Sequence, residues 1–377
     1  MNNSAPPKVS VLMSVYNHER YVAAAISSVL AQSFADFEFI ILNNGSTDRS
    51  SEIIKSFNDP RIVYLNEDEN KTAYWGIETC FNHSCGKYIA FIGSDDVWDC
   101  SKLKEQFEFI EKNIEYGAIF TETKIIDESG KVLEWAPRPF LTAEKNMSRY
   151  GWLREFFFFS NSVCWPSCLM NRNLKPPSSW SDARFKQLGD LNLWINVLSK
   201  KNIYVYPQEL TYYRQHGENE SQKDFEFLYN RANLESYYLL DYYKKISTDE
   251  LPEIFPELRE VKVLNAGNKD FYLAKLAMER FPDTGNEKAR KMFGLLTIFN
   301  MYSNKEMVDE VSLTNDFSLN DFYRLTGTGI NLAHLGKSSL TEARFATLVF
   351  ELVKRIKRIS KRFFTMGIKN LAQRLKR

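Results

Sequence analysis

The chain has 377 residues and a formal net charge of +1, with a hydrophobic fraction of 44% and a charged fraction of 26%. These values are ordinary for a soluble globular protein, and the length favours more than one domain. No apolar stretch approaches the roughly 20 residues that cross a bilayer, and residues 1–8 do not read as a signal peptide, so we expect a cytoplasmic protein. The five cysteines form no zinc-binding pattern, and we expect them to be reduced.

The first part of the chain alternates strand and helix patterns. Apolar runs predict strands over residues 9–16, 37–42, 61–65 and 88–92, and helical spacing predicts helices over 21–31 and from Ser46 or Thr47 to Phe57. This alternation is typical of a parallel sheet with right-handed crossovers. The carboxyl ends of such strands face one crevice, where open α/β folds bind ligands.

Polar side chains follow the predicted strands at this crevice. Asp95 and Asp96 come directly after the fourth strand, and together they could hold a divalent cation, although an Asp pair also commonly caps a helix or lies in a turn. Tyr16, Asn43 and Asn44 end the first and second strands. We expect all of these side chains to lie close together although they are far apart in sequence.

Five segments occur in an order that is typical of one enzyme family. They are residues 9–17, 44–48, 86–96, 189–194, and 212–216 with Ser221. In these segments the chain resembles the inverting glycosyltransferases of family 2, which have the GT-A fold. The resemblance implies an α/β fold of Rossmann-like type, with a mostly parallel sheet flanked by helices, over residues 1–222. Past Ser221 no segment matches, and helical periodicity predicts a helical accessory domain over 223–340, with helices at 224–246, 258–280, 287–302 and 319–335.

The resemblance implies transfer of a sugar from a nucleotide-diphosphate sugar, most simply a UDP-sugar, to a hydroxyl of a glycan or lipid-linked acceptor. Such a reaction serves the assembly of bacterial surface polysaccharides or glycoconjugates. A divalent cation, Mn²⁺ or Mg²⁺, would stabilise the diphosphate leaving group. By the resemblance, its ligands are Asp95, Asp96 and His216, the last of which could instead be a surface histidine, whereas we expect His18 to face solvent.

The remaining donor contacts follow from the same resemblance. Ser94 would bond the ribose and Arg214 the diphosphate, Lys71 would supply a further charge, and the base and its pocket would fall to Ser14, Tyr16, Asn43 and Asn44. Tyr16 could also be a buried strand aromatic.

Asp190 matches the catalytic base that removes the proton of the acceptor hydroxyl. It precedes an apolar stripe and therefore lies at a predicted helix start, where a carboxylate could instead be a plain cap.

The chain departs from the family pattern at several places. Gly93 stands for the first aspartate of the DxD motif, Asn43 and Asn44 for an aspartate pair, Tyr74 and Trp75 for an Arg-Asn pair, and Gly189 for a glutamate. These changes also fit a scaffold that binds a nucleotide sugar with weakened turnover. The aromatic run 156–159 lies in a segment that we expect to be the acceptor side, although such runs are more often core.

Residues 341–377 form a predicted basic amphipathic helix. After Phe350 there are ten basic residues and one acidic residue, so the rest of the chain is net acidic. This pattern favours an anionic membrane surface at the inner face of the cell membrane, with packing on the helical domain as the alternative. We expect no nucleic acid partner, because the rest of the chain is acidic.

Overall fold

The computed structural model describes residues 5–134, 136, 140–175, 184–217, 219, 225–278, 286–303, 308–309, 311 and 317–327. The chain divides into two compact units, residues 1–316 and 317–377. The second unit contributes one described helix, α12 (Leu319–Gly327). No described helix combines the length and the hydropathy that a membrane crossing requires.

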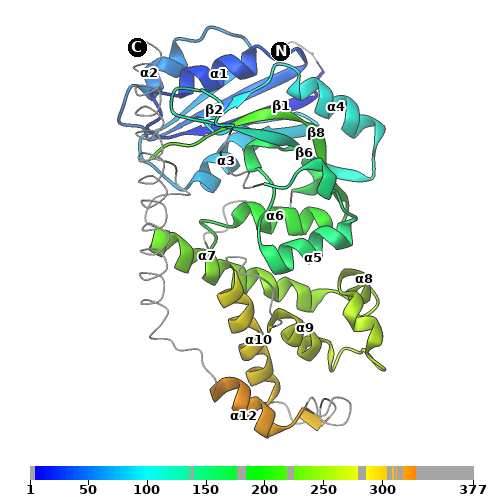
Figure 1. Cartoon of the computed structure of the whole chain (residues 1–377). Helices are drawn as coiled ribbons and strands as arrows, with labels where there is room; N and C mark the ends of the chain where they lie inside the picture. Colours follow the sequence, from blue (N-terminus) through cyan, green and yellow to red (C-terminus); the bar gives the residue numbers. More distant parts are fainter. Residues whose placement is uncertain are drawn as a thin grey trace, which may run out of the picture. The chain divides into compact units, whose positions relative to one another are not determined.

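A mixed sheet forms the centre of the first unit (Figure 1). Its strand order is β3-β2-β1-β4-β7-β6-β8-β5. Strands β1, β2, β3 and β4 run parallel, β7 is antiparallel to both β4 and β6, β8 is parallel to β6, and β5 is antiparallel to β8. The bounds are β1 Val9–Val15, β2 Phe37–Asn44, β3 Ile62–Glu67, β4 Tyr88–Phe91, β5 Val97–Trp98, β6 Tyr116–Ile126, β7 Leu169–Asn171 and β8 Asn202–Arg214.

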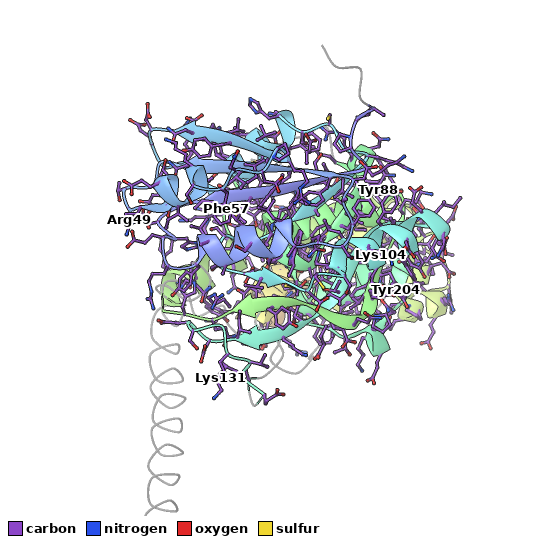
Figure 2. All side chains as sticks on the ribbon, turned by 90° about the horizontal axis from the view of Figure 1, so that it is seen from above. Arg49, Phe57, Tyr88, Lys104, Lys131 and Tyr204 are labelled. Atoms are coloured by element: carbon purple, nitrogen blue, oxygen red, sulfur yellow. The ribbon has the colours of Figure 1, made fainter. Side chains whose placement is uncertain are left out.

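Helices cover both faces of the sheet. Successive strand residues point to opposite faces, so apolar side chains of one strand pack on both helix layers. In β1, Val11 and Met13 pack on the layer of α1 (Val22–Leu30), α2 (Ser50–Lys55) and α4 (Lys102–Lys112). Figure 2 looks down on the side chains of the molecule and marks α4 by Lys104. Leu12 instead packs on the layer of α3 (Ala73–Asn82), α5 (Arg149–Phe159) and α6 (Gly189–Leu198).

Further helices extend the layer of α5 and α6. They are α7 (Phe225–Leu240), the 3₁₀ turn η4 (Asp241–Lys245), α8 (Leu251–Ile254), α9 (Lys269–Met278) and α10 (Glu287–Met301). Phe157 of α5 lies 4.9 Å from Tyr243 and 4.8 Å from Phe255, measured between ring centroids. Phe156, Phe157 and Phe158 are all buried, so most of the aromatic run belongs to the core.

The α/β fold with additional helices is confirmed, and two predicted helices need correction. The helix expected over 258–280 is wrong between the 3₁₀ turn at Pro256–Glu260 and the start of α9. There the side-chain Oδ1 of Asn265 accepts from the backbone N–H groups of Gly267 and Asn268, a local turn that competes with a helix. The second helix also begins later than expected, at Ser50. Residues 328–340 and the basic helix over 341–377 lie outside the described residues, and the domain boundaries at 222 and 340 stay predictions.

Candidate active site

The carboxyl ends of β1, β2 and β4 meet at one edge of the sheet, because these strands run parallel. Tyr16 follows β1 and is 42% exposed, so it is not a buried strand aromatic. Asn43 and Asn44 end β2, and the loop with Asp95 follows β4. Ser14 lies against α3, where a Cβ on Gly76 would be 2.2 Å from the Ser14 hydroxyl. The sheet thus places these predicted site residues at neighbouring strand ends, while their ligand roles stay predictions.

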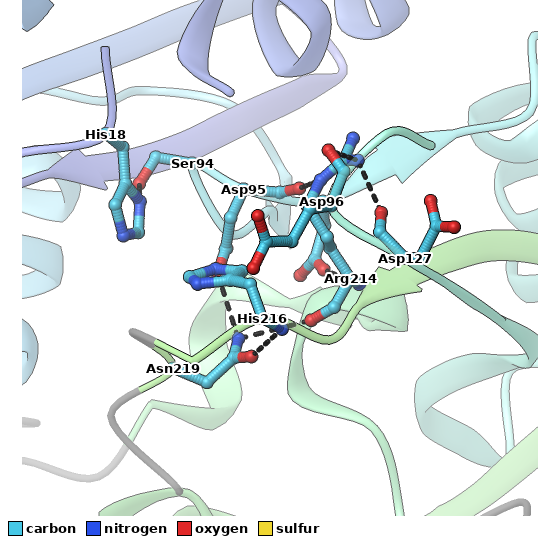
Figure 3. Close-up of polar contacts among 9 residues, drawn as sticks. His18, Ser94, Asp95, Asp96, Asp127, Arg214, His216 and Asn219 are labelled. Atoms are coloured by element: carbon cyan, nitrogen blue, oxygen red, sulfur yellow. Dashed lines mark hydrogen bonds and ion pairs between the residues drawn. The ribbon is translucent and has the colours of Figure 1, made fainter. Parts of the chain in front are cut away.

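Side chains from three separate loops form a candidate metal centre (Figure 3). Potential ligand atoms of His18, Asp95 and His216 all lie within 4.8 Å of one another. His216 Nε2 is 3.0 Å from Asp95 Oδ2, and His18 Nδ1 is 2.6 Å from the hydroxyl of Ser94. The expectation that His18 faces solvent is therefore wrong: its ring is partly buried and turned into the site.

Neighbouring groups hold His216 and Asp95 in place. The ring of Tyr21 stacks on His216 with centroids 4.6 Å apart. Asn219 donates to Asp95 Oδ2 at 3.3 Å and accepts the backbone N–H of His216 at 2.6 Å. Such contacts fix the orientation of metal ligands. Neither Tyr21 nor Asn219 was predicted from the sequence.

The pKa values of the two adjacent carboxylates are shifted in opposite directions. Burial opposes ionisation of Asp95, but the hydrogen bond from His216 and the charge of His18 lower its pKa overall. Burial and the charge of Asp95 raise the pKa of Asp96 well above its usual range. Asp96 is 2% exposed and accepts the backbone N–H of Arg214 at 2.9 Å. Asp96 is not a member of the cluster that His18, Asp95 and His216 form among the described residues.

The guanidinium of Arg214 is engaged by backbone carbonyls. Its Nε donates to the carbonyl of Asp95 at 2.6 Å, and its Nη1 donates to those of Asp127 and Glu128 at 2.9 and 3.1 Å. Arg214 therefore ties the loop after β4 to the turn after β6. A contact of Arg214 with a diphosphate stays a prediction.

The two asparagines that replace the family's aspartate pair have different partners. Asn43 Nδ2 donates to the side-chain carbonyl of Asn66 at 2.9 Å. Asn44 donates to the backbone carbonyl of Lys71 at 2.9 Å and accepts its backbone N–H at 3.1 Å. An ionised aspartate at position 43 could not donate the bond to Asn66. Asn44 thus shapes the loop before α3.

The ammonium group of Lys71 already has partners. It lies 3.0 Å from the Glu67 carboxylate and 3.8 Å from the centre of the Trp75 ring. Its predicted phosphate contact would compete with the ion pair. Trp75 packs against the core on its other side.

Two departures from the family pattern meet in space. A Cβ on Gly189 would lie 2.6 Å from Cζ of Tyr74, so the tyrosine ring fills the room that a side chain at position 189 would need. The Tyr74 hydroxyl accepts the backbone N–H of Asp190 at 3.1 Å. The changes at positions 74 and 189 therefore form one packed unit beside Asp190.

Asp190 lies in the first turn of α6, as predicted. Burial raises its pKa to about 7, although hydrogen bonds from the N–H of Leu191 and from Asn161 favour the charged form. Asn161 Nδ2 donates to Asp190 Oδ2 at 2.6 Å. The carboxylate is enclosed, although the residue as a whole is partly exposed.

The backbone turns sharply before Asn161. Ser160 has φ 65° and ψ −156°, a region that residues other than glycine rarely adopt. This turn directs the chain from the end of α5 toward Asp190. Strain of this kind gathers at functional sites, and no sequence signal at Ser160 predicts it.

Glu235 of α7 anchors the segment that leads into α6. Its carboxylate accepts the backbone N–H groups of Lys186, Gln187 and Leu188, each at 2.8 Å, and the Nε of Arg231 at 2.7 Å. The side chain is 1% exposed. Glu235 therefore fixes the place where α6 begins, and with it the position of Asp190.

An aromatic bridge connects the two carboxylate regions. The ring of Trp165 stacks on Phe91 of β4 at 4.1 Å and lies 5.5 Å from Trp194 of α6. Beside it, burial and then the charges of Asp96 and Asp190 raise the pKa of the Cys164 thiol. The loop after β4 and the start of α6 thus flank the same short segment.

Comparison with known proteins identifies relatives of this chain. The model of the family "Glycosyl transferase family 2" matches residues 10–172. The glucosyltransferase WfgD of Escherichia coli is 29% identical over 52% of this chain and 71% of its own length. Its full name is UDP-Glc:alpha-D-GlcNAc-diphosphoundecaprenol beta-1,3-glucosyltransferase. WfaP of Escherichia coli has the same enzyme name and is 28% identical over 60% of this chain and 84% of its own length. An uncharacterized glycosyltransferase of Rickettsia bellii is 31% identical over 69% of this chain, which spans only 37% of that relative.

A solved structure gives a more distant likeness. TarS residues 1–349 of S. aureus, in complex with UDP-GlcNAc, has a TM-score of 0.49 and 16% identity over 81% of this chain and 91% of that chain. This likeness is too weak to support an inference about ligands. Residues 10–172 of the chain thus match glycosyl transferase family 2, and the relatives of the chain are glycosyltransferases.

Proposed function

We propose that the protein moves a sugar, with inversion at the anomeric carbon, from a nucleotide-diphosphate sugar to a hydroxyl of a glycan or lipid-linked acceptor. The observation that carries this proposal is Asp190, an enclosed carboxylate whose pKa is raised to about 7. A base with a pKa near the working pH is well suited to take a proton. Asp190 would remove the acceptor proton as the acceptor oxygen attacks opposite the leaving group.

A UDP-sugar is the proposed donor. Tyr16 presents an exposed ring at the end of β1, where a base could stack, and the Asn43 carbonyl accepts only a long bond of 3.4 Å from the N–H of Ser46. That carbonyl could therefore accept from a uracil N–H. The names of WfgD and WfaP specify UDP-glucose, which supports the same class of donor.

The proposal includes a divalent cation, Mn²⁺ or Mg²⁺. Asp95 and His216 offer the carboxylate oxygen and imidazole nitrogen that would hold it, and Asp96 could act through water. When bound, the cation would neutralise the charge that develops on the departing diphosphate. Ser94 would then be placed for the donor's ribose, beside Asp95.

A lipid-linked acceptor at the inner face of the cell membrane completes the proposal. WfgD and WfaP are named for an undecaprenol-linked acceptor. The ten basic residues after Phe350 would attract an anionic surface by about 1 kcal/mol each. Sedimentation with anionic vesicles tests this part: a chain ending at Phe350 should be released, and the full chain should be released by high salt. Equal binding by both chains would leave the segment without a membrane role.

A binding scaffold with weakened turnover is the second candidate. The observation that favours it is the absence of carboxylates at Gly93 and Gly189, where the family has acidic residues. Donor hydrolysis distinguishes the two functions, because a scaffold would bind the nucleotide sugar without cleaving it.

The deciding experiment combines binding and turnover. The full chain is screened for thermal stabilisation by UDP-, GDP- and dTDP-sugars with Mn²⁺, since a ligand that binds the native state raises the melting temperature. The stabilising donor is then incubated with a GlcNAc-diphospholipid, and the anomeric configuration of the product is determined by NMR. A β-linked product from an α-linked donor supports inverting transfer. Retention of configuration, or stabilisation without any turnover, would contradict the proposal.

A further inference from the structure

We infer that His18 is the third protein ligand of the cation site, in place of the carboxylate that position 93 does not supply. The resulting donor set, two imidazoles and one carboxylate, would select a divalent transition-metal ion over Mg²⁺. This inference rests on the proposed function and assigns the ligands and metal preference of the same site.

His18 is held at the site by its backbone as well as its ring. Its N–H donates to the hydroxyl of Ser50 at 3.0 Å, and its carbonyl accepts the N–H groups of Tyr21 and Val22, both at 2.9 Å. The ring Nδ1 bonds to Ser94 at 2.6 Å, and we assign the coordination to Nε2. A hydrogen bond from one ring nitrogen commonly orients a histidine whose other nitrogen binds a metal.

The space around Gly93 explains why another residue supplies the ligand. A Cβ at this position would lie 2.5 Å from Asp96 Oδ2 and 2.7 Å from Asp95 Oδ1. The carboxylates of Asp95 and Asp96 thus occupy the room that a side chain at 93 would enter. His18 approaches instead from the loop after β1, and its ring centroid lies 5.8 Å from that of His216.

The spacing of the donor atoms suits one ion after a small closure. Two ligands at right angles, each about 2.1 Å from a metal, are about 3.0 Å apart. His216 Nε2 and Asp95 Oδ2 are 3.0 Å apart. The whole cluster lies within 4.8 Å, slightly more than the roughly 4.2 Å that separates ligands on opposite sides of an ion. A shift of a few tenths of an ångström would close it.

The chemistry of the donors sets the expected selectivity. Mg²⁺ prefers oxygen ligands and gives up its waters reluctantly. Imidazole favours ions such as Co²⁺ and Zn²⁺, and affinity for nitrogen-containing sites rises from Mn²⁺ to Co²⁺. With two of three protein ligands being nitrogen, the site should hold Co²⁺ in the presence of a large excess of Mg²⁺.

Titration of the full chain with Co²⁺, with and without UDP, tests this by the visible absorption of the bound ion. His18→Ala should weaken Co²⁺ binding by about tenfold or more, the scale at which disturbed metal sites lose affinity. Asp95→Ala should abolish binding. His83→Ala is the matched control, because His83 is exposed at the end of α3 and is not part of the cluster, and it should bind as the unmodified chain does. His18→Asp should retain a cation but allow Mg²⁺ to displace Co²⁺.

Equal Co²⁺ affinity in the His18→Ala and unmodified chains would overturn the inference, as would displacement of Co²⁺ by an equal concentration of Mg²⁺ from the unmodified chain. Melting temperatures of the variants test whether misfolding causes a loss, and we expect the backbone bonds of His18 to be retained in His18→Ala and His18→Asp. Sugar transfer in chelator without bound cation would overturn the inference but leave glycosyl transfer intact. Normal, His18-dependent Co²⁺ binding without transfer to any acceptor would support the inference and count against the proposed function.

Discussion

The site has two halves: a cation half around His18, Asp95 and His216, and a base half around Asp190. Different kinds of bond hold them. In the cation half, groups that would meet the ligand bond to one another, as His216 does to Asp95 and His18 to Ser94. In the base half, Asp190 is positioned by groups behind it, including Glu235, which holds the backbone before α6. A ligand can replace the first set of bonds and leave the second set unchanged. We therefore expect the cation half to exchange partners when a ligand binds, and the base half to keep its bonds.

The largest expected effect is in the base half. Asp190→Asn keeps the shape of the side chain but cannot take a proton, so turnover should fall by about two to four orders of magnitude. Donor binding, which depends on the other half, should be retained. Steady-state turnover and donor-induced thermal shift measure the two effects, with Asp249→Asn at an exposed position as control. Unchanged turnover would reduce Asp190 to a helix cap.

Glu235→Gln tests whether Glu235 holds Asp190 in position through the backbone before α6. The amide loses the charge that three backbone N–H groups and Arg231 share. Weakening a buried, charged hydrogen-bond group costs about 1 to 3 kcal/mol. We expect a lower melting temperature and a turnover reduced by about tenfold, with donor affinity preserved. Glu260→Gln, on an exposed residue, is the control. A loss of donor affinity instead would break the distinction between the halves.

The pH profile sharpens the comparison. Because the pKa of Asp190 is raised to about 7, turnover should rise with pH through that value as the base ionises. The hydrogen bond from Asn161 favours the ionised form, so Asn161→Ala should move the midpoint to higher pH. The neutral acid is favoured in the fold, and the stability it contributes is lost as pH rises from 3.8 to about 7. An unchanged pH midpoint of turnover in Asn161→Ala would contradict the assignment of this midpoint to Asp190.

The smallest expected effect concerns the donor side. Asn44→Asp would set a carboxylate against the backbone carbonyl of Lys71, at the cost of about 1 to 3 kcal/mol. The melting temperature should fall and donor affinity should weaken modestly, while the pH midpoint of turnover remains. Asn70→Asp, at an exposed position in the same loop, is the control. A variant as stable as the original would mean that Asn44 does not hold this loop.

Local patterns predicted the parts of the site that lie at the ends of regular elements. Apolar runs located β1, β2 and β4, and parallel pairing then brought Asn43 and Asp95 to one edge. The same reasoning located Asp190 at a helix start. These predictions succeeded because the strand period is set by nearby residues and because strands joined by helical crossovers commonly pair in parallel.

The partners of those residues could not be predicted, because they depend on packing between distant segments. Glu235 is 45 or more positions from the backbone groups that it holds, and a single glutamate on a helix carries no signal of that role. The same is true of Asn161, whose approach depends on the backbone of Ser160. A lone histidine in a loop led us to predict that His18 faces solvent. Its contact with Ser94 could be seen only in the structure.

The contact between Tyr74 and Gly189 has an evolutionary consequence. Because a Cβ at position 189 would lie 2.6 Å from the tyrosine ring, a glutamate there would require the Tyr74 side chain to move. Replacing Tyr74 first would remove both the ring and the acceptor for the N–H of Asp190. Each single step toward the common family pattern therefore passes through a destabilised intermediate. The two positions are expected to change together among descendants of this sequence, as an epistatic pair beside the proposed catalytic base.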